Sequence, residues 1–178
     1  MSMFVLFVKT GYENKVMMEV SCTWLFDKTL YPFSPTYDTY YKRGGKFVIV
    51  KKLWLPGYVF IESKLSGLDF YALSKPFINY SQYIFKLLRY GGSHLDTSFE
   101  MTSDECQFIK HLTGAERCVG ISVGVIDKSI LNIISGPLIG LESFVKKIDR
   151  HKRLAYVEIN IHGEPRVVKF GLEVIRKN

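Results

Sequence analysis

A chain of 178 residues that is 47% apolar and 15% aromatic is long enough for one medium domain or two small ones, and it is too apolar to be disordered. Its net charge of +7 suggests a polyanionic partner, but the surplus does not distinguish RNA, DNA, an acidic protein or a membrane, nor does it require a partner at all. The three cysteines form no C-x-x-C pair, so we expect neither a disulfide framework nor a metal site. No leader-like pattern opens the chain and no apolar run approaches the ~20 residues that cross a bilayer, which predicts a cytoplasmic protein without membrane contact.

Residues 1–112 carry the pattern of an α+β domain. Runs of apolar and β-branched residues predict strands, and apolar residues spaced four apart predict helices. The expected strands are Met3–Lys9, Thr36–Tyr41, Phe47–Trp54, Tyr58–Glu62 and Tyr83–Tyr90. The expected helices are one through Val16, Val20 and Trp24, a weak one at Gly67–Lys75, and one after a capping box in which Thr102 caps the Glu105 amide and Glu105 reaches back. This order predicts an N-terminal antiparallel sheet with flanking helices.

A hairpin is expected where two of these strands flank Lys42-Arg43-Gly44-Gly45. Its basic tip has two interpretations that the residues leave open: it contacts phosphate, or it is a solvated loop.

From residue 121 onward, short strands follow one another with turn residues between them. They are expected at Ile130–Ile134, Phe144–Ile148, Leu154–Ile161 and Arg166–Phe170, and Gly171 is expected to end the last. Strands at this spacing over about 55 residues predict a small C-terminal β-barrel. The short polar segment 113–120 is the expected linker between the two parts.

Residues 53–61 (LWLPGYVFI) resemble the L-F-P-G-Y-V-F-V signature of the N-terminal (NGN) domain of NusG-type transcription factors. The stretch follows a basic hairpin, as in the family, and the run from Phe4 to Lys15 is similar to the family's first strand and helix start. The chain departs from the signature at Trp54-Leu55, where the family usually has Leu-Phe. This departure alters the shape of the polymerase contact that the resemblance implies.

Residues 135–142 (SGPLIGLE), followed by FVKKI at 144–148, look like a KOW motif. This motif marks the SH3-like barrel at the C-terminus of NusG-type factors and of some ribosomal proteins. Gly136 and Gly140 suit a turn with positive φ and close backbone approach, and Ser143 stands where KOW domains commonly have Gly. The resemblance implies an NGN domain over 1–112, a linker over 113–120 and a KOW barrel over 121–178.

Within this family, residues 146–155 (KKIDRHKRLA) and 171–177 (GLEVIRK) look like the LoaP group of specialised paralogues. The resemblance implies processive antitermination, in which the protein binds RNA polymerase and an RNA hairpin in the leader of a long operon. Some relatives refold the C-terminal domain as a helical hairpin. Here the β-branched residues within 156–170 predict a barrel without such a switch.

The candidate RNA-binding segment is 146–153, which has five Lys or Arg, one His and a single acid in eight positions. Lys offers a point charge to phosphate, and Arg binds phosphate or a guanine edge through two hydrogen bonds. The predicted RNA-binding residues are Lys146, Lys147, Arg150, His151, Lys152 and Arg153, anchored by Val145, Ile148 and Leu154. The alternative is a solvated basic loop with no partner.

The family resemblance also assigns contacts with the transcription machinery. It implies an apolar patch for a coiled-coil region of the largest polymerase subunit, formed by Phe7, Leu55, Pro56 and Phe60. Lys9 and Lys15 are expected near upstream DNA, Lys42 and Arg43 at a further nucleic-acid contact, and Gly67–Lys75 at the opposite polymerase jaw.

No catalytic constellation is present in the sequence. His94, His111, His151 and His162 have no H-E-x-x-H or triad context, and no phosphate-binding G-x-x-x-x-G-K-[ST] occurs, so we expect no enzyme, cofactor or metal. The leading hypothesis is a monomeric antiterminator. Two alternatives are a general elongation factor whose barrel contacts termination factor or the ribosome, and a ribosome-associated RNA-binding protein that never binds polymerase.

Overall fold

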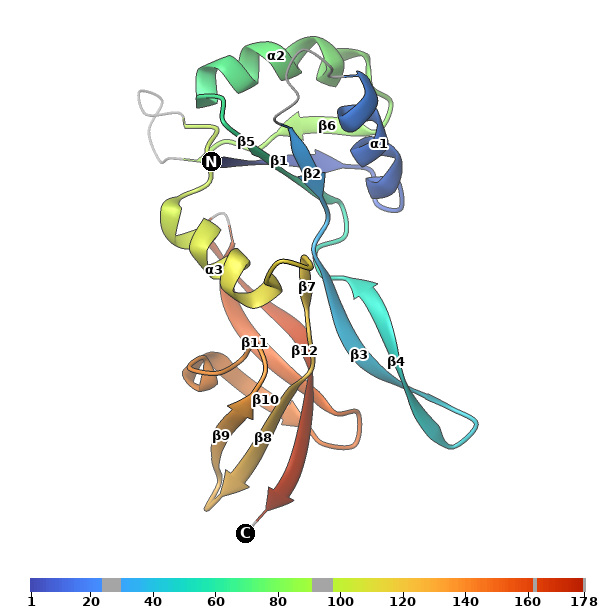
Figure 1. Ribbon diagram of the computed structural model, residues 1–178, viewed down its shortest axis with the longest axis vertical. Helices are drawn as coiled ribbons and strands as arrows, with labels where there is room; N and C mark the ends of the chain where they lie inside the picture. Colours follow the sequence, from blue (N-terminus) through green and yellow to red (C-terminus); the bar gives the residue numbers. More distant parts are fainter. Residues whose placement is uncertain (24–29, 91–97, 162, 178) are drawn as a thin grey trace. The chain divides into compact units, whose positions relative to one another are not determined.

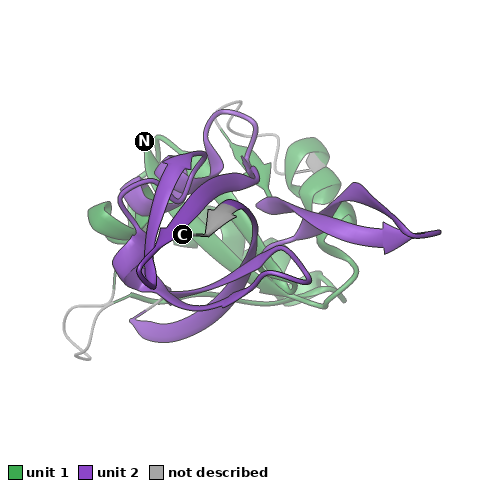
Figure 2. Ribbon diagram, turned by 90° about the horizontal axis from the view of Figure 1, so that it is seen from below, with its two compact units in different colours: residues 1–34, 55–106 green, residues 35–54, 107–178 purple. Residues whose placement is uncertain are grey.

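The computed structural model describes residues 1–23, 30–90, 98–161 and 163–177. The chain divides into two compact units, each assembled from two separate segments (Figures 1 and 2). Unit 1 comprises Met1–Ser34 and Leu55–Cys106, and unit 2 comprises Pro35–Trp54 and Gln107–Asn178. The expected hairpin therefore groups with the C-terminal strands. The domain bounds 1–112, 113–120 and 121–178 stay a prediction about parts that fold independently.

Unit 1 is built on a four-stranded antiparallel sheet with the order β2-β5-β1-β6. Its strands are β1 (Ser2–Val8), β2 (Tyr31–Phe33), β5 (Tyr58–Ser63) and β6 (Ile84–Leu87). The apolar runs around residues 3–9 and 58–62 thus form the two central strands, as their buried patterns predicted. The short strand β2 was not expected, because Pro32 weakens the strand signal.

Two helices, α1 (Glu13–Thr23) and α2 (Gly67–Tyr80), cover one face of this sheet (Figure 1). Val16 and Val20 of α1 join alternate residues of β1 and β5 in one buried cluster, and Phe70 of α2 stacks on Phe4 with ring centroids 3.9 Å apart. The helix spacing of Val16 and Val20 is therefore confirmed, whereas Trp24 lies outside the described residues. Helix α2 is longer than expected and continues through Pro76.

A buried carboxylate fixes the turn that precedes β5. Glu13 is 2% exposed, and its two oxygens accept backbone N–H bonds from Gly11 (2.8 Å) and Gly57 (2.7 Å). A buried charge is costly unless hydrogen bonds compensate it, and here both oxygens have a donor. Glu13 thereby holds the Pro56-Gly57 turn of the family-like stretch against the start of α1.

Unit 2 contains a five-stranded sheet with the order β10-β11-β12-β8-β9. Seen end-on in Figure 2, its strands curve around a common axis. The strands are β8 (Ser122–Asp127), β9 (Ile130–Ser135), β10 (Val145–Asp149), β11 (Leu154–Ile161) and β12 (Glu164–Lys177), with a 3-10 helix η1 (Glu142–Phe144) before β10. The strands expected around 130–134, 144–148, 154–161 and 166–170 are all present, and this part of the chain is not a helical hairpin.

The KOW-like stretch forms the turn after β9. Gly136 has φ +97°, and a Cβ there would lie 2.6 Å from the Ser122 Cα, so glycine is required both for its φ and for close approach. Gly140 has φ +77° with open space around it, so only its φ explains the glycine. Ser122 Oγ accepts the N–H of the buried Leu138 and ties the turn to β8.

The hairpin of β3 (Thr36–Arg43) and β4 (Lys46–Leu53) belongs to unit 2, where β3 pairs in parallel with β7 (Cys118–Val119) and contacts β12. Phe170 of β12 is fully buried, with the Trp54 and Tyr37 rings at 5.3 and 6.1 Å. Strand β7 lies within the expected linker 113–120, because Cys118 and Val119 find a partner strand that the polar composition of that segment does not reveal.

Gly171 does not end the last strand, contrary to the sequence interpretation, since β12 runs through it and Gly171 pairs with Leu154. A Cβ at Gly171 would meet the backbone oxygen of Asp38 at 2.8 Å and Ile121 Cγ1 at 2.9 Å. The glycine therefore serves the close approach of β3 to β12 rather than a turn.

Helix α3 (Ser103–Thr113) begins at the predicted capping box. The Glu105 N–H donates to Thr102 Oγ1 at 3.3 Å, as expected, and the Thr102 hydroxyl donates to the Glu105 carboxylate at 2.9 Å. The Glu105 side chain thus reaches back to Thr102, as the sequence interpretation expected.

Replacing Gly171 by Ala should destabilise the protein by about 2 kcal/mol, because a methyl group would press on backbone that cannot rotate away. Gly120→Ala is the matched control, since a Cβ there meets nothing within 4 Å. Urea unfolding of both variants measures the difference. Equal stability of the two variants would contradict the close packing of β3 on β12.

Candidate nucleic-acid interface

The basic segment 146–153 forms the end of β10 and the turn into β11, and its cations have different surroundings. Lys146 Nζ lies 3.2 Å from Glu158, and Lys152 Nζ lies 3.9 Å from Asp149. Asp149 also accepts the Lys152 backbone N–H at 2.9 Å, which shapes the turn. Arg150 and His151 are exposed at its tip. The expected anchors Val145, Ile148 and Leu154 are half-buried, and the neighbouring Ala155 and Val157 are fully buried.

Tyr156 of β11 lies between two lysines. The Lys147 and Lys169 ammonium groups are 5.6 and 5.5 Å from the centre of its ring. An aromatic ring beside cations suits an unpaired base with its adjoining phosphates. The sequence interpretation missed Tyr156 and Lys169, because they become neighbours of Lys147 only through the pairing of β10, β11 and β12.

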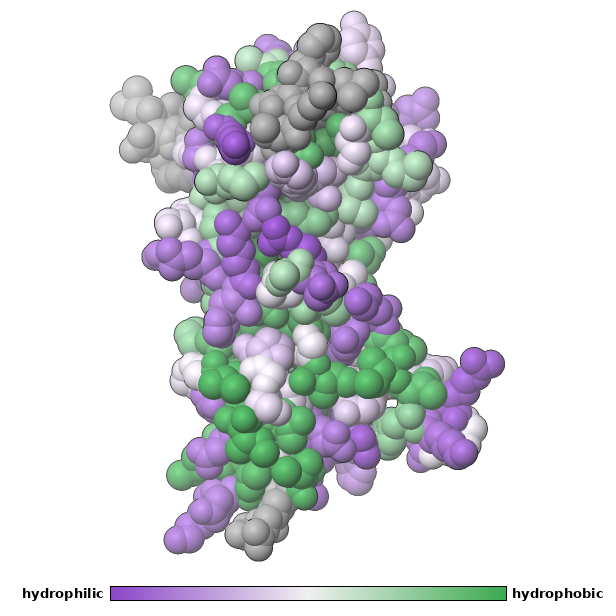
Figure 3. Space-filling view, viewed as in Figure 1, coloured by the Kyte–Doolittle hydropathy of each residue, from purple (hydrophilic) through white to green (hydrophobic). Residues whose placement is uncertain are grey.

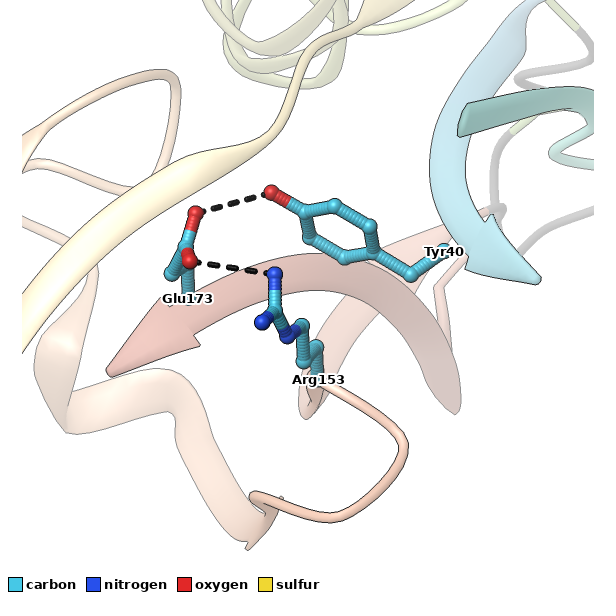
Figure 4. A network of polar contacts seen from close by, with 3 residues as sticks. All are labelled: Tyr40, Arg153 and Glu173. Carbon is cyan, nitrogen blue, oxygen red and sulfur yellow. Dashed lines mark hydrogen bonds and ion pairs between the residues drawn. The ribbon is translucent and has the colours of Figure 1, made fainter. Parts of the chain in front are cut away.

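Arg153 differs from the other cations because its guanidinium is paired with a carboxylate and stacked on aromatic rings of unit 2 (Figure 4). Its Nη1 lies 3.0 Å from Glu173 Oε1, and its guanidinium carbon is 4.8 Å from the Tyr40 ring centre and 4.4 Å from that of Phe47. The Tyr40 hydroxyl donates to Glu173 Oε2 at 2.9 Å. Burial raises the pKa of Tyr40, and the bond to the Glu173 carboxylate raises it further, so the hydroxyl stays a donor.

The Arg153 network connects the hairpin to the basic turn. Tyr40 and Phe47 come from β3 and β4, Glu173 from β12, and Arg153 ends the turn at φ +52°. A guanidinium that is already paired and stacked is not available to phosphate in this conformation. Among the predicted RNA-binding residues, Arg153 is therefore engaged within the protein, whereas Lys147, Arg150 and His151 are exposed.

The lysines expected near DNA lie on unit 1 beside a pair of stacked tyrosines. The Tyr12 and Tyr83 rings are 4.4 Å apart and 15° from parallel, and the Lys9 ammonium lies 5.0 Å from the centre of Tyr12. Lys15 Nζ donates to the Tyr83 hydroxyl at 2.9 Å, and this bond raises the pKa of Lys15. The structure thus brings Lys9 and Lys15 to one aromatic cluster.

Lys42 and Arg43 are exposed at the end of β3, and the turn itself is the Gly44-Gly45 pair. Both cations face solvent, and their contact with nucleic acid stays a prediction.

Of the four residues expected in the polymerase patch, Leu55 and Phe60 are buried, Phe7 is half-buried and Pro56 is exposed. Phe7 packs against Tyr58 and Phe85, with ring centroids 5.5 and 5.4 Å away, and Phe85 is 56% exposed. A partner can therefore touch Phe7 and Pro56 of the expected patch in this conformation, together with the neighbouring Phe85. The sequence interpretation missed Phe85, which joins them through the pairing of β1 with β6.

Unit 2 also exposes apolar side chains. Figure 3 shows them over β8, β9 and the hairpin, where Ile130, Ile134, Val48 and Ile49 are exposed. Apolar exposure of this kind marks protein-contact surfaces more often than RNA sites.

In the part of the chain that the structure describes, no three His, Cys, Asp or Glu side chains gather in a way that would hold a metal ion. His94 and His162 lie outside the described residues. None of the described helices is long and apolar enough to cross a membrane.

Comparisons with known proteins find similarity among solved structures. Models of protein families gave no match, and neither did curated protein sequences. Among solved structures, the chain is similar to NusG of Thermotoga maritima, described as showing domain interaction in that protein. The match covers 97% of this chain and 93% of that one, with 20% identity and a TM-score of 0.51. This similarity shows that the two chains share an α+β fold.

Changing Tyr40 to Phe should destabilise the protein by about 1 kcal/mol, because Glu173 loses a donor while the ring remains under Arg153. Tyr41→Phe is the control, since Tyr41 is 55% exposed on the same strand. Urea unfolding at neutral pH measures both. If the two variants unfold at the same urea concentration, the Tyr40–Glu173 bond does not stabilise the packing of the hairpin.

Proposed function

We propose that this protein is a transcription elongation regulator of the NusG type, which binds RNA polymerase through an N-terminal NGN domain and RNA through a C-terminal KOW barrel. The fold shared with Thermotoga maritima NusG over nearly the whole chain supports the general assignment. The family-like stretches at 53–61 and 135–142 support it independently.

The finer proposal is processive antitermination of the LoaP type, with a hairpin in an operon leader as the recruiting RNA. The observation that carries it is the cationic surface around β10 and β11. There Lys147 and Lys169 flank Tyr156, and Arg150 and His151 are exposed beside them. A barrel that contacts only a protein does not need cations arranged beside an aromatic ring. A barrel that binds a structured RNA with an unpaired base does need them.

RNA recruitment and polymerase binding act together in this proposal. The hairpin RNA raises the local concentration of the protein beside the polymerase that has just transcribed it. The protein would bind one jaw of the polymerase through the Phe7 region, which is the surface of Phe7, Pro56 and Phe85, and the other jaw through α2. Binding both jaws would favour the closed and pause-resistant state. The protein would act as a monomer without cofactor, with upstream DNA as a further contact of Lys9 and Lys15.

Replacing Lys147 and Arg150 by Ala should weaken hairpin-RNA binding and reduce the slope of log K against log salt by about 1.5, because each phosphate contact contributes about 0.7–0.9. Lys64 and Lys75 are exposed lysines of unit 1, so their Ala variant removes the same charge elsewhere. Fluorescence anisotropy over a salt series measures both.

An equal loss in the two variants would reduce the RNA interaction to general phosphate attraction. The protein would then be a general elongation factor whose barrel contacts termination factor or the ribosome. A ribosome-associated RNA-binding protein would bind RNA and leave polymerase unbound in a pull-down.

Replacing Phe7 and Phe85 by Ala should reduce polymerase binding at least tenfold, because interface energy concentrates in a few large aromatic side chains. Met18 and Tyr31 are 68% and 54% exposed on α1 and β2, away from both proposed polymerase contacts, and their Ala substitutions serve as the control for loss of exposed apolar area. Retention of purified polymerase on immobilised protein measures the effect. Unchanged retention would remove the Phe7 region from the polymerase contact.

A further inference from the structure

A cavity of about 510 Å³ opens on unit 2 between the basic turn and the end of β12. The residues that matter for its chemistry are Lys147, Ile148, Asp149, Arg150, Glu173 and Val174. Its volume is within the range of small-ligand sites, about 300–1,000 Å³. The lining combines cations, two carboxylates and two aliphatic side chains, which suits a ligand that is anionic at one end and donates hydrogen bonds at the other.

We propose that this cavity binds a single unpaired guanine nucleotide, presented by the loop of the RNA that the barrel recognises. The inference rests on the proposed function and adds to it the base that the barrel reads.

The two carboxylates select guanine over the other bases. An ionised carboxylate only accepts hydrogen bonds, so it favours a base edge on which two donors are adjacent. The Watson–Crick edge of guanine presents two adjacent donors, N1–H and the N2 amine. Adenine and cytosine present a ring-nitrogen acceptor beside their amine, and uracil presents carbonyl oxygens beside its N3–H. Asp149 and Glu173 would therefore pair with guanine and repel an acceptor on the other bases.

Glu173 is already fixed in position before any ligand arrives. One of its oxygens accepts from Arg153 and the other from Tyr40, as Figure 4 shows. Each carboxylate oxygen can accept a second hydrogen bond, so the group keeps capacity for a base. Ordering the acceptor within the protein reduces the entropy that binding would otherwise cost.

The rest of the lining suits the remaining parts of a nucleotide. Ile148 and Val174 are half-buried aliphatic side chains that can contact the flat face of a base. Lys147 and Arg150 are exposed at the cavity and can reach the adjoining phosphates. Arg153 has a positioning role in this site, because it acts on the base through Glu173.

The test uses the full-length protein and hairpin RNAs with one stem and a uridine loop that carries G, A, C or U at its central position. Binding is measured by fluorescence anisotropy at fixed salt. We expect the G loop to bind about ten- to a hundredfold more tightly than the other three. An inosine loop, which lacks only the N2 amine, should be intermediate. This comparison leaves the protein unchanged and so does not depend on any variant folding.

The matched protein variant is Asp149→Asn, whose remaining oxygen can still accept the Lys152 N–H and preserve the turn. We expect its preference for the G loop to fall below about threefold while its affinity for the U loop is kept. Glu158→Gln is the control, because Glu158 faces Lys146 and is not part of the cavity. It should keep the full preference for G.

Titration of free GMP and AMP separates a loop nucleotide from a free one. Equal binding of all four hairpins would overturn the guanine site and leave the RNA-binding function in place. Binding of GMP but not AMP, without binding of any hairpin, would overturn the RNA source of the guanine and the proposed function with it. If neither the hairpins nor GMP bind, both the guanine site and the RNA-binding function are overturned.

Discussion

Contact between the backbone of β3 and that of β12 at Gly171 is the constraint on which the candidate interface depends. With no side chain at that position, the Asp38 carbonyl can approach where a methyl group would clash. The close approach brings Tyr40 within hydrogen-bonding distance of Glu173 and places the Tyr40 and Phe47 rings under the Arg153 guanidinium. Glu173 and Arg153 then form one wall of the cavity beside the basic turn. A glycine that pairs with Leu154, next to the basic turn, thus determines the shape of the surface that the exposed cations surround.

The cations of the basic turn should not be regarded as equivalent. Arg153 supports the cavity wall, Lys146 faces Glu158, and Lys152 lies near the carboxylate that shapes the turn. Partly exposed ion pairs of this kind contribute little to stability, so Lys146 and Lys152 can exchange partners at low cost. Arg153 is different, because two rings and a hydrogen-bonded carboxylate hold it together. Lys147 and Arg150 remain as the residues best placed for phosphate.

Local patterns in the sequence predicted the elements well, and non-local contacts account for what they missed. Val16 and Val20 predict α1, and the 58–62 run predicts a central strand, because burial of one face leaves a periodic trace. The 135–142 stretch predicts its turn, because Gly136 has a φ that other residues avoid.

In contrast, β7 is two residues long and exists only because β3 is beside it. Arg153 shows the same limit for the site: it is one basic residue among several in the sequence, and its partners Tyr40 and Glu173 are far from it along the chain. The burial of Leu55 and Phe60 likewise depends on packing that a short motif does not encode.

The assembly of unit 2 from two separate segments affects how the chain folds as it is synthesised. The hairpin leaves the ribosome early, yet Tyr40 is 133 residues from its partner Glu173, near the end of the chain. Until then, the Phe47 ring has no Arg153 guanidinium to stack on, and the indole of Trp54 has no β12 to pack against. Contacts of such large sequence separation form slowly, and an unpaired apolar hairpin is open to association with other chains meanwhile. The lysines and arginine near the hairpin tip, at positions 42, 43 and 46, carry like charge, which disfavours the pairing of two nascent hairpins until the last strand arrives.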